Sequence, residues 1–192
     1  MRSILIPLLV LGFAGCSTVK YAPTLQFSVT PSVSVEETTS NGKILAVRSL
    51  DAARPYRANI VVRPEPNVID SIPQRDWAEW PRDVVTRTLF DAIVATHRFK
   101  DVGLASNLEL PDYILTGEVR TFDLLQYESP WVAECSVRLE IRAFRSGDAL
   151  MAKTISKRVP LESNEIGALP EAMSEAVKQV VEEAATEIRA LP

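Results

Sequence analysis

Alternating apolar and polar positions predict a group of long strands in the second half of the chain. Between Ala133 and Phe144, every second residue is apolar and the residues between them are polar or charged. This period of two is typical of a strand with one buried and one wet face. Ser146-Gly147-Asp148 predicts a hairpin turn, Leu150 to Val159 the returning strand, and Tyr113 to Phe122 a further strand. The buried set of the first strand is Cys135, Val137, Leu139, Ile141 and Ala143.

Shorter apolar runs predict a small meander in the first half. Lys43 to Leu50, Asn59 to Arg63 and Val68 to Ile72 are the expected strands, with a loop around Pro55 after the first. The preceding stretch, Thr18 to Asn41, is rich in Ser, Thr and Pro and predicts a tether. Alternation at Leu25, Phe27 and Val29 leaves a marginal edge strand as the alternative there.

Two segments have the apolar spacing of helices. The first follows Pro81, which suits a first helical turn, and should end near His97-Arg98. The second runs from Pro170 to Ala190. The order of elements predicts a single α+β domain over residues 42–192, an antiparallel-rich sheet with both helices packed on one face. The inward residues are Val84, Val85, Leu89, Ala92 and Ile93 in the first helix, and Met173, Ala176, Val177, Val180, Ala184, Ile188 and Leu191 in or just after the second.

The N-terminus carries an export signal. One basic residue, Arg2, precedes an apolar run from Ile4 to Phe13 that would span about 15 Å as a helix, half a bilayer. Ala14-Gly15-Cys16 follows and resembles a bacterial lipobox, although Phe13 stands where Leu is usual. We expect residues 1–15 to be a lipoprotein signal peptide and 16–41 to be the acylated Cys16 with its tether; an ordinary signal peptide that happens to precede a Cys is the alternative.

The composition of the chain argues against several classes of ligand and of catalytic site. The 21 Lys and Arg residues against 25 Asp and Glu give a net charge of −4, which argues against nucleic acid as a partner. One His and two distant Cys cannot form a Cys/His zinc site, and we predict no metal and no cofactor. Because neither a nucleophile elbow nor a Walker pattern is present, an enzyme is disfavoured; a hydrolase would have to use His97. Asp76 and Glu79 are better explained as helix caps than as an acid/base pair.

Three Trp residues are the candidate partner-binding residues. Trp77 and Trp80 lie within four positions of each other, and Trp131 follows Ser129-Pro130 in a predicted loop. Trp is enriched among the residues that dominate protein interfaces. The alternative interpretation is that these rings cover the core beneath the first helix.

Together these segments resemble the ABC-type transport auxiliary lipoproteins. The resemblance rests on the lipobox, Ile44-Leu45-Ala46-Val47, Arg54-Pro55-Tyr56, Asn59 to Arg63, Trp77-Ala78-Glu79-Trp80-Pro81, Tyr113 to Gly117 with Phe122, and a C-terminal helix holding Ala172 and Ala176. It covers about residues 40–190, and the Trp-Ala-Glu segment is its most specific part. Trp80 stands where the family more often has Pro.

The resemblance implies a non-catalytic role in moving phospholipid or other hydrophobic molecules between the two membranes. The expected partners are an MCE-domain protein and its ABC transporter, and Ser17, which is not Asp, resembles the signal for release to the outer membrane. The protein would then face the periplasm from a lipid anchor in that membrane. Self-association and direct phospholipid binding stay open. The alternative function is an envelope assembly lipoprotein of a secretion or lipopolysaccharide-export machine.

Overall fold

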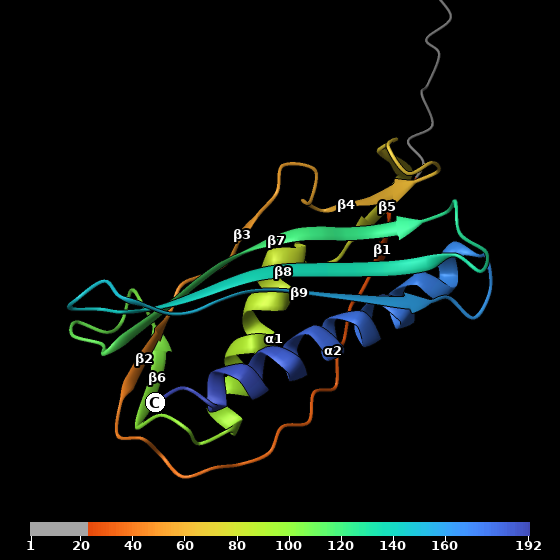
Figure 1. Ribbon diagram of the computed structural model, residues 1–192. Helices are drawn as coiled ribbons and strands as arrows, with labels where there is room; N and C mark the ends of the chain where they lie inside the picture. The colour runs from red at the N-terminus through yellow and green to blue at the C-terminus, as the bar shows by residue number, and fades with distance from the viewer. Residues whose placement is uncertain (1–22) are drawn as a thin grey trace, which may run out of the picture.

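The computed structural model describes residues 23–192, so the predicted signal peptide and Cys16 lie outside the described residues. The domain has two layers, a twisted mixed sheet and two helices that lie against one face of it (Figure 1). This arrangement is the predicted α+β fold. Within residues 23–192, none of the helices is long and apolar enough to cross a membrane.

Three long strands make up one half of the sheet, and the last of them forms its edge. They are β7 (Tyr113–Leu125), β8 (Val132–Ala143) and β9 (Ala149–Pro160), paired antiparallel in chain order. The β8–β9 turn contains Gly147 at a φ of +76°, a conformation that glycine adopts without strain. The hairpin predicted from alternation is thus confirmed.

Short strands complete the sheet and make it mixed. β2 (Ile44–Val47), β3 (Asp51–Ala52) and β4 (Asn59–Arg63) all run parallel to β7, and β6 (Asp101–Leu104) runs parallel to β2 at the far edge. On the other side, β5 (Asp70–Trp77) pairs antiparallel with β4, and β1 (Leu25–Phe27) pairs parallel with β5. The sequence did not predict β3 or β6, and β5 starts later and ends later than the expected strand at Val68 to Ile72.

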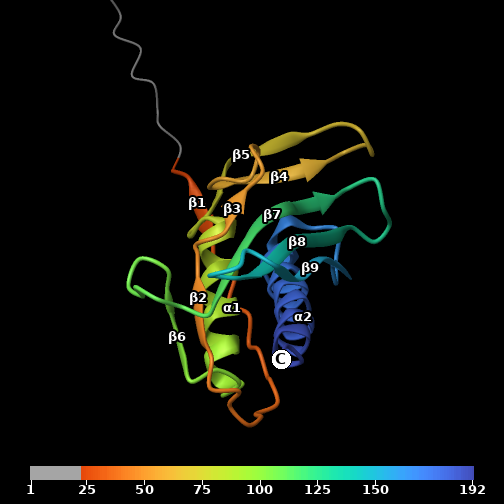
Figure 2. The ribbon, with the colours of Figure 1, turned by 60° about the vertical axis from the view of Figure 1, so that its left-hand side comes forward.

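The two helices share one face of the sheet and contact each other (Figures 1 and 2). α1 spans Pro81–Ala95, and α2 spans Leu169–Arg189 directly after a short 3-10 turn, η1 (Ile166–Ala168). α2 covers β8 and β9 along its length, whereas α1 crosses beneath β7, β3 and β6. Their predicted apolar stripes face the sheet and are buried.

The core lies between α2 and the central strands. Met173 and Val177 of α2 and Val137 and Leu139 of β8 are all completely buried. Cys135 is buried beside them, as expected for a structural thiol, and this burial raises its pKa to about 12. A thiol in that environment is protonated and unreactive at neutral pH.

The stretch before β2 differs from the predicted tether. β1 forms, in agreement with the edge-strand alternative, and the chain then runs along both helices. The Ser34 N–H donates to Glu182 of α2, and the Asn41 N–H donates to the carbonyl of Arg98 just beyond α1. Because Val29 is buried and these backbone donors find partners, the folded domain begins near residue 25 rather than at 42.

Candidate docking surface

Trp77 belongs to the core. It ends β5 with only 3% of its surface exposed, and its ring packs edge-on against Phe122 with centroids 5.4 Å apart. Edge-to-face packing of this kind stabilises aromatic pairs. The interpretation of Trp77 as a core residue therefore fits the structure, and its ring is not open to a partner.

Trp80 is exposed at the start of α1. It is the N-cap residue and keeps 40% of its surface exposed, with the Arg82 guanidinium 4.7 Å above its ring. The predicted capping by Asp76 and Glu79 is wrong. Asp76 lies in β5, and Glu79 instead accepts a 2.8 Å bond from Arg87, which raises the pKa of Arg87.

Pro81 explains why the helix needs no side-chain cap there. Pro has no N–H, so the first helical position leaves no donor to satisfy. The Asp83 and Val84 N–H groups donate to the carbonyl of Trp80. Only the backbone of Trp80 takes part in the hydrogen bonds at the start of the helix, and its side chain projects at the surface.

Trp131 is half-buried and lies apart from the other two. It sits in the connection between β7 and β8, which lies on a different side of the domain from α1 in Figure 2. Its ring packs against the core. The backbone N–H of Trp131 donates to the side chain of Asn164 at 2.9 Å, and its backbone carbonyl accepts from the Leu161 N–H at 2.7 Å. These two bonds fix the loop to the segment before α2.

Trp80 begins a stripe on the outward side of α1. Asp83, Arg87, Phe90 and Val94 follow it at intervals of three or four residues, the spacing that puts side chains on one helix face. Val94 is exposed and Phe90 is half-buried. The sequence analysis does not predict this stripe, because the inward period of α1 is stronger; the spacing of Trp80, Phe90 and Val94 on the same helix is the available signal.

A groove runs between this stripe and the edge strand β6. It encloses about 590 Å³ and is lined by Phe90, Val102 and Leu104, with Asp83 and Arg87 on its helix side. We call it the α1–β6 groove. Leu104 is 41% exposed. An apolar floor with charged residues on its rim is the composition of a protein-docking surface.

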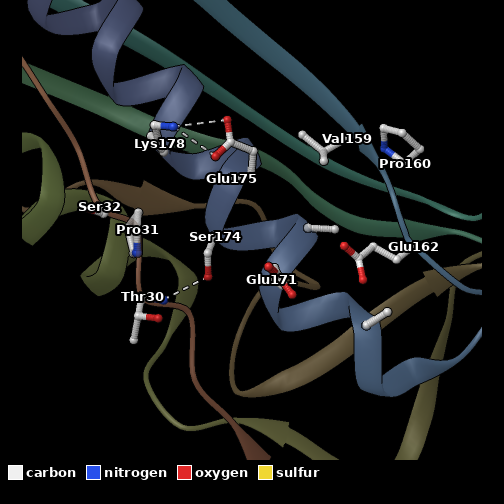
Figure 3. Close-up of a pocket in the computed structure, with 12 residues that line it drawn as sticks. Thr30, Pro31, Ser32, Val159, Pro160, Glu162, Glu171, Ser174, Glu175 and Lys178 are labelled. Carbon is white, nitrogen blue, oxygen red and sulfur yellow. Dashed lines mark hydrogen bonds and ion pairs between the residues drawn. The ribbon is translucent and has the colours of Figure 1, made fainter.

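A second hollow lies on α2 and is more polar than the α1–β6 groove (Figure 3). It encloses about 510 Å³ between residues 30–32 and the end of β9, and its lining includes Glu162, Glu171 and Glu175. The Thr30 N–H donates to Ser174 across it at 2.9 Å. Hydrogen bonds from Gln179 and Lys178 lower the pKa of Glu175, so this carboxylate is already satisfied by its own helix.

A buried charge cluster lies within the sheet. Asp123 of β7 is fully buried and accepts a hydrogen bond from the Arg63 guanidinium of β4. Tyr56, from the loop between β3 and β4, is buried beside them; burial and then the Asp123 charge raise its pKa to about 12. Burial, and then Asp123, also raise the pKa of Glu134. A phenol that stays protonated is a donor and not a base, so the cluster fixes the end of β4 and the Arg54-Pro55-Tyr56 loop.

The remaining candidates for chemistry are dispersed. His97 is exposed just after α1, at a φ of +55°. Over residues 23–192, no three His, Cys, Asp or Glu side chains gather in a way that could hold a metal ion.

The fold and the groove define a class of one-domain α+β proteins with an exposed apolar groove beside a sheet edge. Within that class, the chain belongs to the ABC-type transport auxiliary lipoprotein components, whose family model matches residues 24–185. This match confirms the resemblance drawn from the sequence. It also begins at residue 24, in agreement with the folded start at β1.

Solved structures agree on the fold. A Xanthomonas campestris protein of known crystal structure is 24% identical, with a TM-score of 0.69 over 88% of this chain and 95% of that one. A Chlamydia trachomatis hypothetical protein is 9% identical, with a TM-score of 0.52 over 77% and 96% of the two chains. A search of curated proteins finds no match.

Proposed function

We propose that this protein is a periplasm-facing lipoprotein of the outer membrane that serves an ABC/MCE-type system for lipid transport between the two membranes. The observation that carries the proposal is the family match over residues 24–185, and the Ala14-Gly15-Cys16 lipobox supports the anchor. The protein would have no catalysis of its own. Energy for transport would come from the partner ATPase.

The α1–β6 groove is the proposed docking surface for the MCE-domain partner. It offers an apolar floor, and Trp80 heads the same face of α1. A partly exposed Trp beside an apolar groove is the kind of residue that dominates binding energy in protein interfaces. Trp77 is excluded from this role by burial, and Trp131 by its position in another part of the domain.

Capture of partners from detergent-solubilised envelopes tests the proposal. The full-length lipoprotein would be compared with Trp80→Ala and Leu104→Asp, and co-purifying proteins and lipids identified by mass spectrometry. Leu110→Asp is the matched control, because Leu110 is more exposed, at 69%, and is not part of the groove lining. We expect an MCE-domain protein with the parent and the control, and at least about tenfold less of it with the two groove variants.

Two results would contradict the proposal. Recovery of secretion or lipopolysaccharide-export components without an MCE-domain protein would make the chain an envelope assembly lipoprotein. Equal recovery by all four proteins would move the docking surface away from the groove. Circular dichroism of each variant shows whether it has kept its fold.

The anchor has its own test. Mass spectrometry of the mature protein should show acyl groups on Cys16, and density separation should place the protein in the outer membrane. Cys16→Ala should remove both. A water-soluble mature protein that begins after residue 16 would contradict the anchoring part of the proposal.

A further inference from the structure

The connection between β4 and β5 is an exposed tip with apolar residues at its end. All residues from 64 to 69 are exposed, including the adjacent pair Val68 and Ile69, at 42% and 52%. Loop tips usually carry polar turn residues, because a side chain at a tip stays in water and an apolar one gains no stability from burial. Two neighbouring β-branched residues at such a tip contribute little to the fold and suggest an apolar surface outside the domain.

This tip has a rigid base. The last paired residues of the hairpin are Val62 and Asp70, and the Arg63 side chain next to them is held by the buried Asp123. The Arg63 carbonyl accepts a 2.8 Å hydrogen bond from the Gln126 N–H of the β7–β8 connection. That bond places exposed Tyr127 in the neighbouring loop. Tyr combines an apolar ring with a polar tip, as residues at membrane–water interfaces do.

The chain enters the domain at the same end. The start of β1 and the β4–β5 connection both lie at the upper end in the two ribbon views, although on different sides of it in Figure 2. Leu25 pairs with Arg75, five residues along β5 from Asp70, which is at most about 17 Å of strand. Six residues separate Cys16 from Pro23, and the seven steps between the two span at most about 25 Å of chain. A membrane anchored at Cys16 therefore lies near this end.

We propose that the β4–β5 tip is a second membrane contact, in which Val68 and Ile69, with Tyr127 beside them, enter the interfacial layer of the bilayer that holds the anchor. The proposal rests on the anchoring at Cys16 proposed above. Glu65 and Asp70 flank the tip, so the contact is apolar and does not depend on acidic lipids. Two contacts fix an orientation of the domain that a single anchor does not fix. In this orientation β6, at the lower end of the domain in Figure 1, is turned away from the membrane, and the α1–β6 groove beside it is turned away as well.

An environment-sensitive label tests the contact without depending on acylation. The mature chain, residues 16–192 with Cys16→Ala, would carry an N-terminal histidine tag and be held on vesicles of phosphatidylethanolamine, phosphatidylglycerol and a nickel-chelating lipid. An NBD label would be attached at Ile69→Cys. The matched control is Leu110→Cys, which lies in the connection between β6 and β7, far from the tip in both ribbon views. Cys135 is buried and should stay unlabelled, and a labelling reaction on the mature Cys16→Ala chain checks this.

The expected result is a blue shift of the Ile69 label and at least about twofold stronger quenching by doxyl lipids than at Leu110. Val68→Asp in the Ile69-labelled chain should reverse the shift. If the Ile69 and Leu110 labels behave alike, the membrane contact is wrong even where Cys16 is acylated. If the label shifts but Cys16 carries no acyl group, the contact stands and the anchor proposal fails. If the tip stays in water and Val68→Asp abolishes partner capture instead, the tip is a protein interface and the membrane contact is overturned.

Discussion

α1 and α2 lie on the same face of the sheet, yet their outward sides are built differently. α2 faces solvent with charged side chains that are paired with the sheet, such as Glu183 with Lys153 and Lys157 of β9. The outward side of α1 includes half-buried Phe90 and exposed Val94. It lies beside β6, an edge strand that is hydrogen-bonded to a neighbouring strand on one side only. The outward side of α2 completes the domain, whereas the outward side of α1 leaves apolar surface beyond what the fold needs.

This difference separates what holds the domain together from what it can offer a partner. The length of α2 and its contact with both β8 and β9 make it the main support of the sheet. α1 contributes its inner face to the same core, and its outward stripe includes exposed Trp80 and Val94. Substitutions on the two helices should therefore separate stability from binding, and the predictions below test that separation in order of expected effect on stability.

Met173→Ala, on the inner side of α2, should have the largest effect. Met173 is completely buried against the sheet, and truncating such a residue costs about 2–5 kcal/mol in the free energy of unfolding through lost burial and the cavity left behind. Urea unfolding followed by circular dichroism measures the change. Thr186→Ala, at an exposed position of the same helix, should stay within about 0.5 kcal/mol. Because Ala is the best helix former, neither substitution lowers helix propensity. An equal loss in both variants would therefore mean that burial of Met173 contributes no more than an exposed position does, and that α2 is not held by its core contacts.

The strongest periodic patterns were predictable from the sequence, whereas contacts between distant segments were not. The β8–β9 hairpin and the inward stripe of α2 follow from alternation and helical spacing, because each is long enough for its period to show. β3 and β6 are two and four residues long and exist only because β7 and β2 offer an edge to pair with. A pattern within so few residues does not distinguish a strand from a loop.

The candidate surface was predictable only in part, because it too depends on contacts between segments that are distant in the sequence. The closeness of Trp77 and Trp80 in the sequence makes both of them candidates. The sequence does not show that Trp77 is buried and Trp80 exposed, because this depends on where β5 ends. The groove itself combines α1 with β6, and the unpredicted β6 supplies Val102 and Leu104 of its apolar lining. The sequence predicts a strand over Val68 to Ile72, whereas the pair Val68 and Ile69 lies at a tip because β5 begins only at Asp70.

Glu183→Gln, on the outer side of α2, should have a smaller and pH-dependent effect. Hydrogen bonds from Lys157 and then Lys153 lower the pKa of Glu183 in the folded protein. A lowered carboxyl pKa stabilises the fold above the unfolded value of about 4.3, and this contribution is lost as the pH falls through the folded-state pKa. The variant should thus be up to about 1 kcal/mol less stable than the parent at pH 7 and equal to it in acid.

Urea unfolding at several pH values between 3 and 7 measures this difference. Glu165→Gln, at an exposed position before η1, is the matched control and should show no such pH dependence relative to the parent. If the Glu183→Gln difference persists unchanged at pH 3, the charge pairing between α2 and β9 is not its cause.

Val94→Asp, on the outer side of α1, should affect stability least. Val94 is exposed in the last turn of the helix, so its replacement removes little buried area. An acidic residue near a helix C-terminus is mildly unfavourable, and the net change in unfolding free energy should stay below about 1 kcal/mol. Partner capture should fall with this variant, because the charge is placed on the stripe that runs from Trp80 along the α1–β6 groove. A loss of stability as large as that of Met173→Ala would show that the outward side of α1 is also part of the core, and the contrast between the two helices would then be wrong.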